Sequence, residues 1–131
     1  MSKAPRFLTL PEILIIHRMQ LAEFGGADGV RDTGMLESAM GRAENQWHYE
    51  ERSIPHLAAA YAFGLARNHP FVDGNKRAAL IGAYSFLRLN GYDMTATEAE
   101  AVACILALAA GELSEEGLRA WFDDHVEQVT Q

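Results

Sequence analysis

The stretch HPFVDGNKRAALIGAYSFLRL, residues 69–89, decides how the fold of this chain is interpreted. Its second half is apolar on nearly every side of a helix, which is typical of a helix buried at the centre of a domain. Asn90-Gly91 follows directly and is a strong signal for a helix end. Pro70 disfavours helical geometry in the residue before it, so an earlier helix should end close to Asn68. The stretch therefore predicts two helices joined by the short loop 69–73.

Helix-start signals recur along the rest of the chain. Thr9-Leu10-Pro11-Glu12 and Thr97-Glu98-Ala99-Glu100 both have the capping-box pattern. No segment alternates as a strand longer than a few residues. We predict an all-α fold of about six helices in one domain, residues 1–131. The expected helix starts are Thr9, Asp32, Ser53, Gly74, Thr97 and Ser114.

Two details of this prediction depend on the pattern of polar residues. The polar and aromatic stretch Glu44 to Arg52 is expected to separate the second helix from the third. Residues 46–49 could form a short hairpin, which the sequence does not decide. Helical spacing also predicts which residues share a face. In the first helix these are Ile13, Ile16, Gln20 and Phe24, in the third Leu57, Ala60, Tyr61, Gly64 and Leu65, and in the sixth Leu118, Trp121, Phe122 and Val126.

The composition fits a single domain with an ordinary core. Of the 131 residues 49% are hydrophobic, so the chain can bury a core without disulfides or structural metal. The formal net charge of −7 argues against direct nucleic-acid binding, which needs clustered Lys and Arg. The single cysteine, Cys104, lies in an apolar run and is expected to be a buried, inert thiol.

The sequence does not predict membrane targeting. The first apolar run, residues 7–10, ends at Pro11 and Glu12. It is therefore shorter than the apolar region of a signal peptide. The longest apolar stretches, residues 78–89 and 101–110, are shorter than the roughly 20 residues of a spanning helix. A chain with one cysteine also fits a reducing compartment. We therefore expect a cytoplasmic protein with no membrane partner.

Polar residues gather where the loop meets the helix that follows it. The first turn of a helix presents unpaired N–H groups and the positive end of the dipole, which together bind anions. Gly74 and Asn75 lie in this turn, and Lys76 and Arg77 add charge-assisted donors for a phosphate. Gly74, which has no Cβ, would let a phosphate approach the backbone closely. Residues 74–77 are therefore the expected phosphate-binding turn.

Two further residues complete a candidate reaction centre. Asp73 could hold a magnesium ion that bridges phosphate oxygens, and His69 is the nearby side chain that titrates near neutral pH. His69 is thus the natural general base for a substrate hydroxyl. Each has an ordinary alternative: Asp73 as an N-cap, Lys76 and Arg77 as solvated charges, a lone histidine as structural. Their conjunction within nine residues favours function. The histidines taken as structural or surface residues are His17, His48, His56 and His125.

Residues 69–77, His-Pro-Phe-Val-Asp-Gly-Asn-Lys-Arg, resemble the Fic motif, His-Pro-Phe-x-(Asp/Glu)-Gly-Asn-(Gly/Lys)-Arg, at every constrained position. Lys76 with the residues after it is similar to the Doc, or death-on-curing, branch, which supplies toxins of bacterial toxin–antitoxin pairs. This resemblance implies the compact all-α Fic core. It extends to Phe24-Gly25-Gly26, Gly29-Val30-Arg31-Asp32, Leu36-Glu37-Ser38-Ala39, Gly64-Leu65-Ala66-Arg67-Asn68 and Leu89-Asn90-Gly91-Tyr92.

The resemblance further implies an enzyme that transfers part of ATP to a protein hydroxyl. Adenylylating relatives usually carry Gly where this chain has Lys76, whereas in the Doc branch the Lys goes with transfer of the γ-phosphate. Gly74 stands where Doc toxins can carry Ala, so features of both branches are present. A Doc-type protein kinase is predicted, with protein adenylyl transfer and a non-catalytic antitoxin-binding protein as alternatives. The implied roles are His69 as base, Asp73 as magnesium ligand, and Gly74, Asn75, Lys76 and Arg77 as phosphate ligands.

The resemblance also bears on partners. Residues Thr33 to Glu37 match the first five positions of the self-inhibitory pattern (Ser/Thr)-x-x-x-Glu-(Gly/Asn). The sixth position requires Gly or Asn, and this chain has Ser38 there. Inhibition by a separate antitoxin is therefore expected, through a disordered segment that folds on binding. The target expected for the Doc branch is elongation factor Tu.

Overall fold

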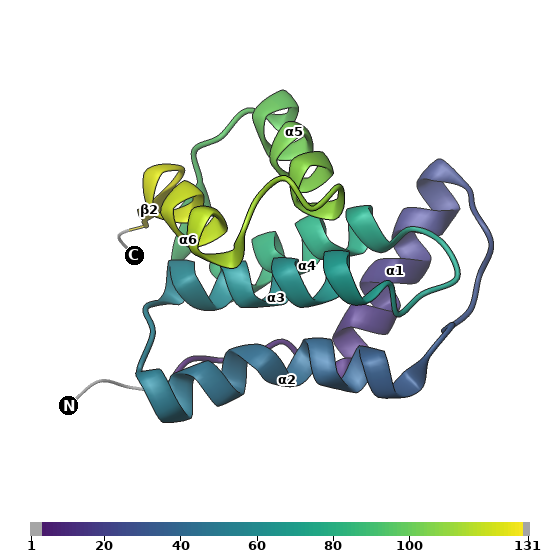
Figure 1. Cartoon of the computed structure of the whole chain (residues 1–131), viewed down its shortest axis with the longest axis horizontal. Coiled ribbons are helices and arrows are strands. Elements are labelled where there is room, and N and C mark those ends of the chain that lie inside the picture. The colour runs from purple at the N-terminus through teal and green to yellow at the C-terminus, as the bar shows by residue number, and fades with distance from the viewer. Residues whose placement is uncertain (1–3, 130–131) are drawn as a thin grey trace.

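The computed structural model describes residues 4–129, which form six α-helices and two short strands (Figure 1). The all-α prediction is confirmed, and every helix starts within one residue of its expected start. Both predicted capping boxes form, because Thr9 and Thr97 exchange hydrogen bonds with the glutamates three residues later. In chain order the elements are α1 (Leu10–Phe24), α2 (Thr33–Glu50), α3 (Ile54–Asn68), α4 (Asn75–Leu89), β1 (Tyr92–Met94), α5 (Glu98–Ala109), α6 (Glu115–Asp124) and β2 (Val126–Gln128).

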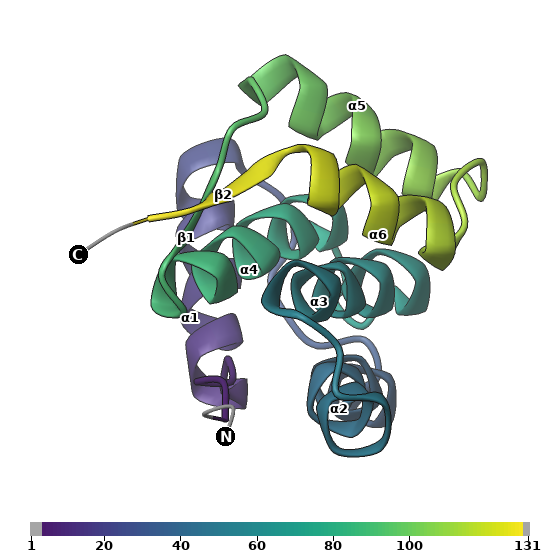
Figure 2. The ribbon, with the colours of Figure 1, turned by 90° about the vertical axis from the view of Figure 1, so that its left-hand side faces the viewer.

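The helix α3 lies at the centre of the fold. It packs against α2 on one side and against α4, α5 and α6 on the others, while α1 packs on α4 (Figure 2). Its small residues allow this, since a Cβ on Gly64 would lie 3.0 Å from the Ala39 Cα of α2. Its predicted face is wholly buried. The sequence indicated α4 as the central helix, which is wrong, because α4 leaves Tyr84 37% exposed.

The helix α2 is longer than predicted. The stretch Glu44 to Arg52, expected to separate two helices, is helical as far as Glu50, and residues 46–49 form no hairpin. The polar residue Gln46 is buried and donates from its Nε2 to Glu115 of α6 at 3.0 Å. A polar stretch thus continues as a helix because a distant carboxylate accepts a hydrogen bond from its inward-facing amide nitrogen, although the amide oxygen Oε1 is buried without a hydrogen-bond partner in residues 4–129.

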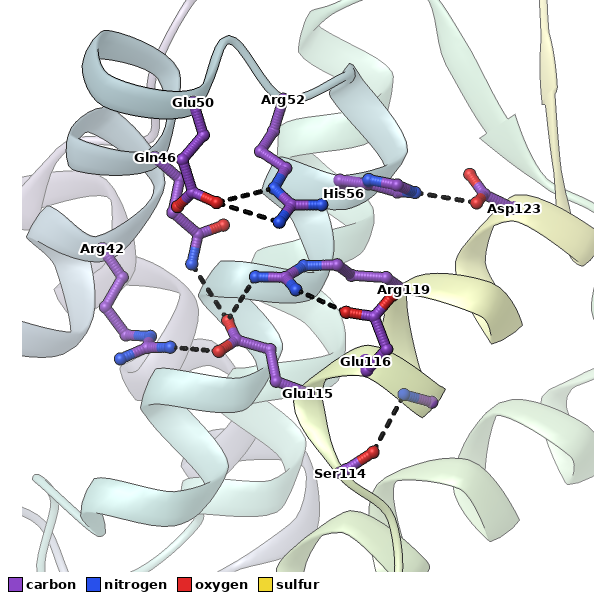
Figure 3. A network of polar contacts seen from close by, with 11 residues as sticks. Arg42, Gln46, Glu50, Arg52, His56, Ser114, Glu115, Glu116, Arg119 and Asp123 are labelled. Atoms are coloured by element: carbon purple, nitrogen blue, oxygen red, sulfur yellow. Dashed lines mark hydrogen bonds and ion pairs between the residues drawn. The ribbon is translucent and has the colours of Figure 1, made fainter.

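Glu115 is the centre of a polar network between α2 and α6 (Figure 3). Its carboxylate accepts hydrogen bonds from Arg42 and Gln46, and the Arg119 guanidinium lies 3.7 Å away, one turn along α6. Burial alone would raise the pKa of Glu115, but these hydrogen bonds and charges lower it below its ordinary value. The network therefore favours the charged carboxylate and ties α6 to α2.

Two predicted helix faces are only partly right. In α1, Ile13 is buried as predicted, but the second buried residue is His17, and Phe24 is 59% exposed. Val126, assigned to the face of the last helix, lies beyond it in β2. There it pairs with Met94 of β1 in a two-stranded antiparallel sheet. The end of the described chain is thereby joined to the segment after α4.

The single cysteine is buried, as predicted. Cys104 lies on α5 and is 7% exposed, and burial raises the pKa of its thiol to about 11. At neutral pH the sulfur is therefore a protonated thiol and a poor nucleophile.

None of the helices in residues 4–129 combines the length and the apolar character needed to cross a bilayer.

Candidate active site

The loop between α3 and α4 is the framework of the site. It begins at His69, the C-cap of α3, and ends at Gly74, the N-cap of α4. Both residues are left-handed, with φ of 48° and 76°, a conformation that costs a non-glycine residue about 1–2 kcal/mol. A Cβ on Gly74 would face His17 and Leu21 of α1. The backbone angle thus explains this glycine, which is a different reason from the phosphate approach suggested by the sequence.

The side chain of Asn75 braces the loop from inside. Its Oδ1 accepts a hydrogen bond from the Phe71 N–H at 2.9 Å, and its Nδ2 donates to the Phe71 carbonyl at 3.0 Å. Phe71 is 1% exposed and anchors the loop in the core. Because the Asn75 side chain is engaged with Phe71, the group it leaves for a phosphate is the backbone N–H.

The first turn of α4 leaves donors open. Within residues 4–129 the backbone N–H groups of Asn75, Lys76 and Arg77 donate to no protein group. The Arg77 guanidinium lies 5.0 Å from the centre of the Phe24 ring and donates to the Gly25 carbonyl at 3.5 Å, so it is held beside this turn. Lys76 is exposed. Three open N–H groups and two cations give the turn the electrostatics of an anion site.

Asp73 directly precedes this turn. Its Oδ1 accepts from the Gly74 N–H at 2.8 Å, and its Oδ2 accepts from the Ala27 N–H at 3.4 Å. Gly74 occupies the N-cap position that the sequence also allowed for Asp73. The described residues contain no group of three or more His, Cys, Asp and Glu side chains arranged for a metal ion. A magnesium ion at Asp73 would therefore need phosphate oxygens and water as further ligands, which is a common arrangement for this ion.

Residues 29–32 run beside the loop as a short backbone partner. Val30 and Phe71 form an isolated antiparallel bridge, and the N–H of Val72 donates to the Gly29 carbonyl at 3.0 Å. The loop is therefore held from the side as well as from inside.

Arg31 extends this support to the end of α3. Its backbone N–H donates to the Pro70 carbonyl at 2.7 Å. Its guanidinium donates from Nε to the His69 carbonyl at 2.7 Å and from Nη2 to the Asn68 carbonyl at 2.9 Å. A strained residue persists only when its surroundings fix it, and Arg31 supplies that restraint at His69.

The predicted site residues share one cleft. The exposed imidazole of His69 makes no hydrogen bond within residues 4–129, so its nitrogens are available to a substrate. The imidazole, the carboxylate and the open N–H groups are thus brought together, an arrangement suited to transferring a phosphate-linked group to a hydroxyl. The cleft has a volume of about 280 Å³ and is lined by His69, Val72, Asp73, Gly74, Asn75, Lys76 and Arg77.

Two residues at the site were not assigned to it from the sequence. His17 was taken as a structural or surface histidine, and it is a buried residue against the loop. Arg31 was noticed only as part of the family resemblance. Their partners lie 56 and 38 positions further along the chain, so no local pattern reveals them.

The fold and the cleft define a helical domain with a histidine, a carboxylate and the open N–H groups of a helix N-terminus at one site. The model of the family described as Fic/DOC matches residues 7–87, so the chain belongs to the Fic/DOC family. The matched residues contain α1 to α3, most of α4 and all of the cleft. The family predicted from residues 69–77 is confirmed.

Two curated proteins are similar over long stretches. "Protein kinase doc" of Escherichia phage P1 is 34% identical over 110 residues, which cover 83% of this chain and 86% of that protein. "Toxin Doc" of Mycolicibacterium smegmatis is 45% identical over 76 residues, which cover 56% of this chain and 58% of that protein.

Proposed function

We propose that this chain is the toxin of a toxin–antitoxin pair and that it transfers the γ-phosphate of ATP to a Ser or Thr hydroxyl of a target protein. The observation that carries the proposal is the shared cleft of His69, the Asp73 carboxylate and the open N–H groups of residues 75–77. Phosphoryl transfer depends chiefly on positioning and charge stabilisation, which these groups can supply. The names of the two relatives, a protein kinase and a toxin, support the same assignment.

In the proposed reaction His69 is the general base. An imidazole nitrogen takes the proton of the acceptor hydroxyl while the hydroxyl oxygen forms a bond to the γ-phosphorus. The bond from that phosphorus to the bridging oxygen breaks, and ADP leaves. The N–H groups of residues 75–77, with the Lys76 and Arg77 cations, stabilise the phosphate charge. Asp73 would hold Mg²⁺, which, when bound, neutralises phosphate oxygens.

Lys76 favours phosphoryl transfer over adenylyl transfer. It borders both the cleft and an adjoining apolar hollow against α5, so its stem and cation occupy a space that glycine would leave open. By resemblance, glycine at this position goes with adenylyl transfer. Gly74 gives no independent support to that alternative, because its φ of 76° already accounts for it.

The proposed partners follow from the same assignment. A separate antitoxin would restrain the enzyme, and elongation factor Tu is the target expected from the resemblance. The similarity to a protein named Toxin Doc supports the first expectation.

Labelled ATP distinguishes the candidate reactions. The purified protein is incubated with bacterial lysate, magnesium and ATP labelled at the γ- or the α-phosphate, beside His69→Ala as the control. We expect label on a protein from γ-labelled ATP alone, and none with the control. Label from the α-phosphate would replace the kinase assignment with adenylyl transfer. No transfer from either label would favour a non-catalytic antitoxin-binding protein.

A further inference from the structure

His17 is a buried polar residue whose hydrogen bond and ring stack both reach the loop of the candidate site. It lies on α1 and is 2% exposed. Its ring stacks on Phe71 with ring centres 3.8 Å apart and planes 7° from parallel, and its Nε2 lies 2.7 Å from the Asp73 carbonyl oxygen. A carbonyl oxygen can only accept a hydrogen bond, so Nε2 carries the proton.

This hydrogen bond fixes one peptide unit of the loop. The Asp73–Gly74 peptide is trans, so its carbonyl and its N–H point in opposite directions. The carbonyl points to His17, and the N–H donates to Oδ1 of the Asp73 carboxylate at 2.8 Å. A rotation of this peptide away from His17 would break both contacts together. The imidazole therefore acts on the carboxylate through a single rigid group.

We propose that His17 is a positioning residue that holds the Asp73 carboxylate in place through the Asp73–Gly74 peptide. The inference rests on the proposed function, in which that carboxylate binds Mg²⁺ with ATP. Groups that orient a metal ligand without touching the metal affect affinity by about 10–100-fold when removed. His17 stands in this relation to Asp73, and its ring stack on Phe71 sets the direction of the donor.

Two substitutions separate the donor from the ring. The side-chain nitrogen of glutamine reaches the position of histidine Nε2, whereas that of asparagine reaches only the position of Nδ1. His17→Gln and His17→Asn both lose the stack on Phe71, but only His17→Gln keeps a donor within reach of Asp73. Ile13→Val is the matched control, because Ile13 is fully buried one turn earlier on the same face.

The readouts are ATP affinity with and without Mg²⁺, by calorimetry at a temperature where all variants are folded, and hydrogen exchange of the Gly74 amide. His17→Asn should lose about 10–100-fold of the Mg²⁺-dependent affinity and exchange the Gly74 amide faster. His17→Gln keeps the donor but not the stack, so it should lose clearly less than His17→Asn in both readouts, and Ile13→Val should stay close to the wild type.

Equal behaviour of His17→Gln and His17→Asn in both readouts would overturn the inference, since the donor would then be irrelevant. So would a loss in Ile13→Val as large as that in His17→Asn, because destabilisation alone would then explain it. If the wild type binds no ATP with Mg²⁺, the proposed function fails, and Gly74 exchange alone decides the role of His17.

Discussion

The Nε–H of Arg31 donates to the carbonyl oxygen of His69 across 2.7 Å, although the two residues are 38 positions apart. The same guanidinium reaches the Asn68 carbonyl. The left-handed conformation of His69 costs about 1–2 kcal/mol, and hydrogen bonds to a charged group contribute about 1.5–3 kcal/mol. The Arg31 contacts are therefore large enough to offset the strain at the proposed base.

Arg31→Lys should slow phosphoryl transfer while the protein stays folded. A lysine ammonium cannot hold two carbonyls in the planar fork that arginine provides, and a small displacement of a reacting group can cost about 10²-fold in rate. The measurement is kcat beside a melting curve. Arg18→Lys is the control, because Arg18 is exposed and makes no hydrogen bond in the described part of the chain. A wild-type rate for Arg31→Lys would show that the hydrogen bonds of Arg31 to the His69 and Asn68 carbonyls do not position His69.

His69→Gly and His69→Ala should both abolish transfer and relieve the growth arrest expected on expression without an antitoxin. They should differ in stability, because glycine adopts the φ of 48° freely and alanine does not. Unfolding by urea should find the alanine variant less stable than the glycine variant by about 1 kcal/mol. Toxicity retained by either folded variant would contradict the assignment of His69 as base.

Asp73→Asn should remove the Mg²⁺ dependence of ATP binding with little change in folding stability. The amide oxygen can still accept from the Gly74 N–H, so the loop keeps its local hydrogen bond, while the negative charge that attracts the metal is gone. ATP titrations with and without Mg²⁺, beside a melting curve, measure the two effects. A variant that loses stability but retains Mg²⁺-dependent binding would assign Asp73 a purely structural role.

Lys76→Gly should lose phosphorylation, and adenylylation is the product to look for in its place. The substitution empties the space beside the cleft that the lysine stem occupies. Glycine in a helix costs about 1 kcal/mol of stability, so Lys76→Ala serves as a control that removes the charge with less loss of helix propensity. Assays with γ- and α-labelled ATP give the products. Undiminished phosphorylation by Lys76→Gly would remove Lys76 as the determinant of the reaction.

Glu115→Gln should destabilise the fold by about 1–3 kcal/mol, because it weakens charged hydrogen bonds to Arg42 and Gln46. The neighbouring Glu116→Gln is the control. The Glu116 side chain is 82% exposed, and its one ion pair within residues 4–129 is with Arg119, so its loss should cost less than about 1 kcal/mol. Urea unfolding measures both. Equal effects would mean that the buried network is no stronger than a surface pair.

The same network predicts how stability depends on pH. The pKa of Glu115 is lowered in the folded state from the ordinary value of 4.5, so the unfolded chain binds the proton more readily. The contribution of Glu115 is complete above that ordinary value and is lost as pH falls through the folded-state pKa. Glu12 and Glu100, in the two capping boxes, have lowered pKa values too. Glu115→Gln should therefore flatten the acid limb of the stability curve without abolishing it, and an unchanged limb would contradict the assignment.

The helices were predictable because their ends are marked locally. Threonine, aspartate and serine caps stand before α1, α2, α3, α5 and α6, and proline and glycine bound the loop before α4. The failure at the end of α2 has a physical cause. Gln46 indicates a surface or a loop when read alone, and only the Glu115 side chain, 69 positions away, makes its burial favourable.

The candidate site was predictable as a set of residues, because the six predicted members, His69 and residues 73–77, lie within nine positions and belong to a family motif. Its supports were not. His17 and Arg31 act through backbone carbonyls, which every residue possesses, so nothing in residues 69–77 indicates which distant side chains will bind them. The Asn75 side chain bonds to Phe71, only four positions away. A general anion-site pattern nevertheless does not indicate whether the side-chain amide or the backbone N–H of Asn75 is left for the anion.

The supports from His17 and Arg31 close segments of 56 and 38 residues. Helices form in about a microsecond from local interactions, whereas contacts between such distant segments must first overcome the entropy of closing the intervening chain. We therefore expect helical structure to form before the cleft of the candidate site is assembled. A chain nicked between α1 and α4 loses the covalent connection between His17 and Asp73, so we expect it to lack the geometry of the candidate site even where helices persist.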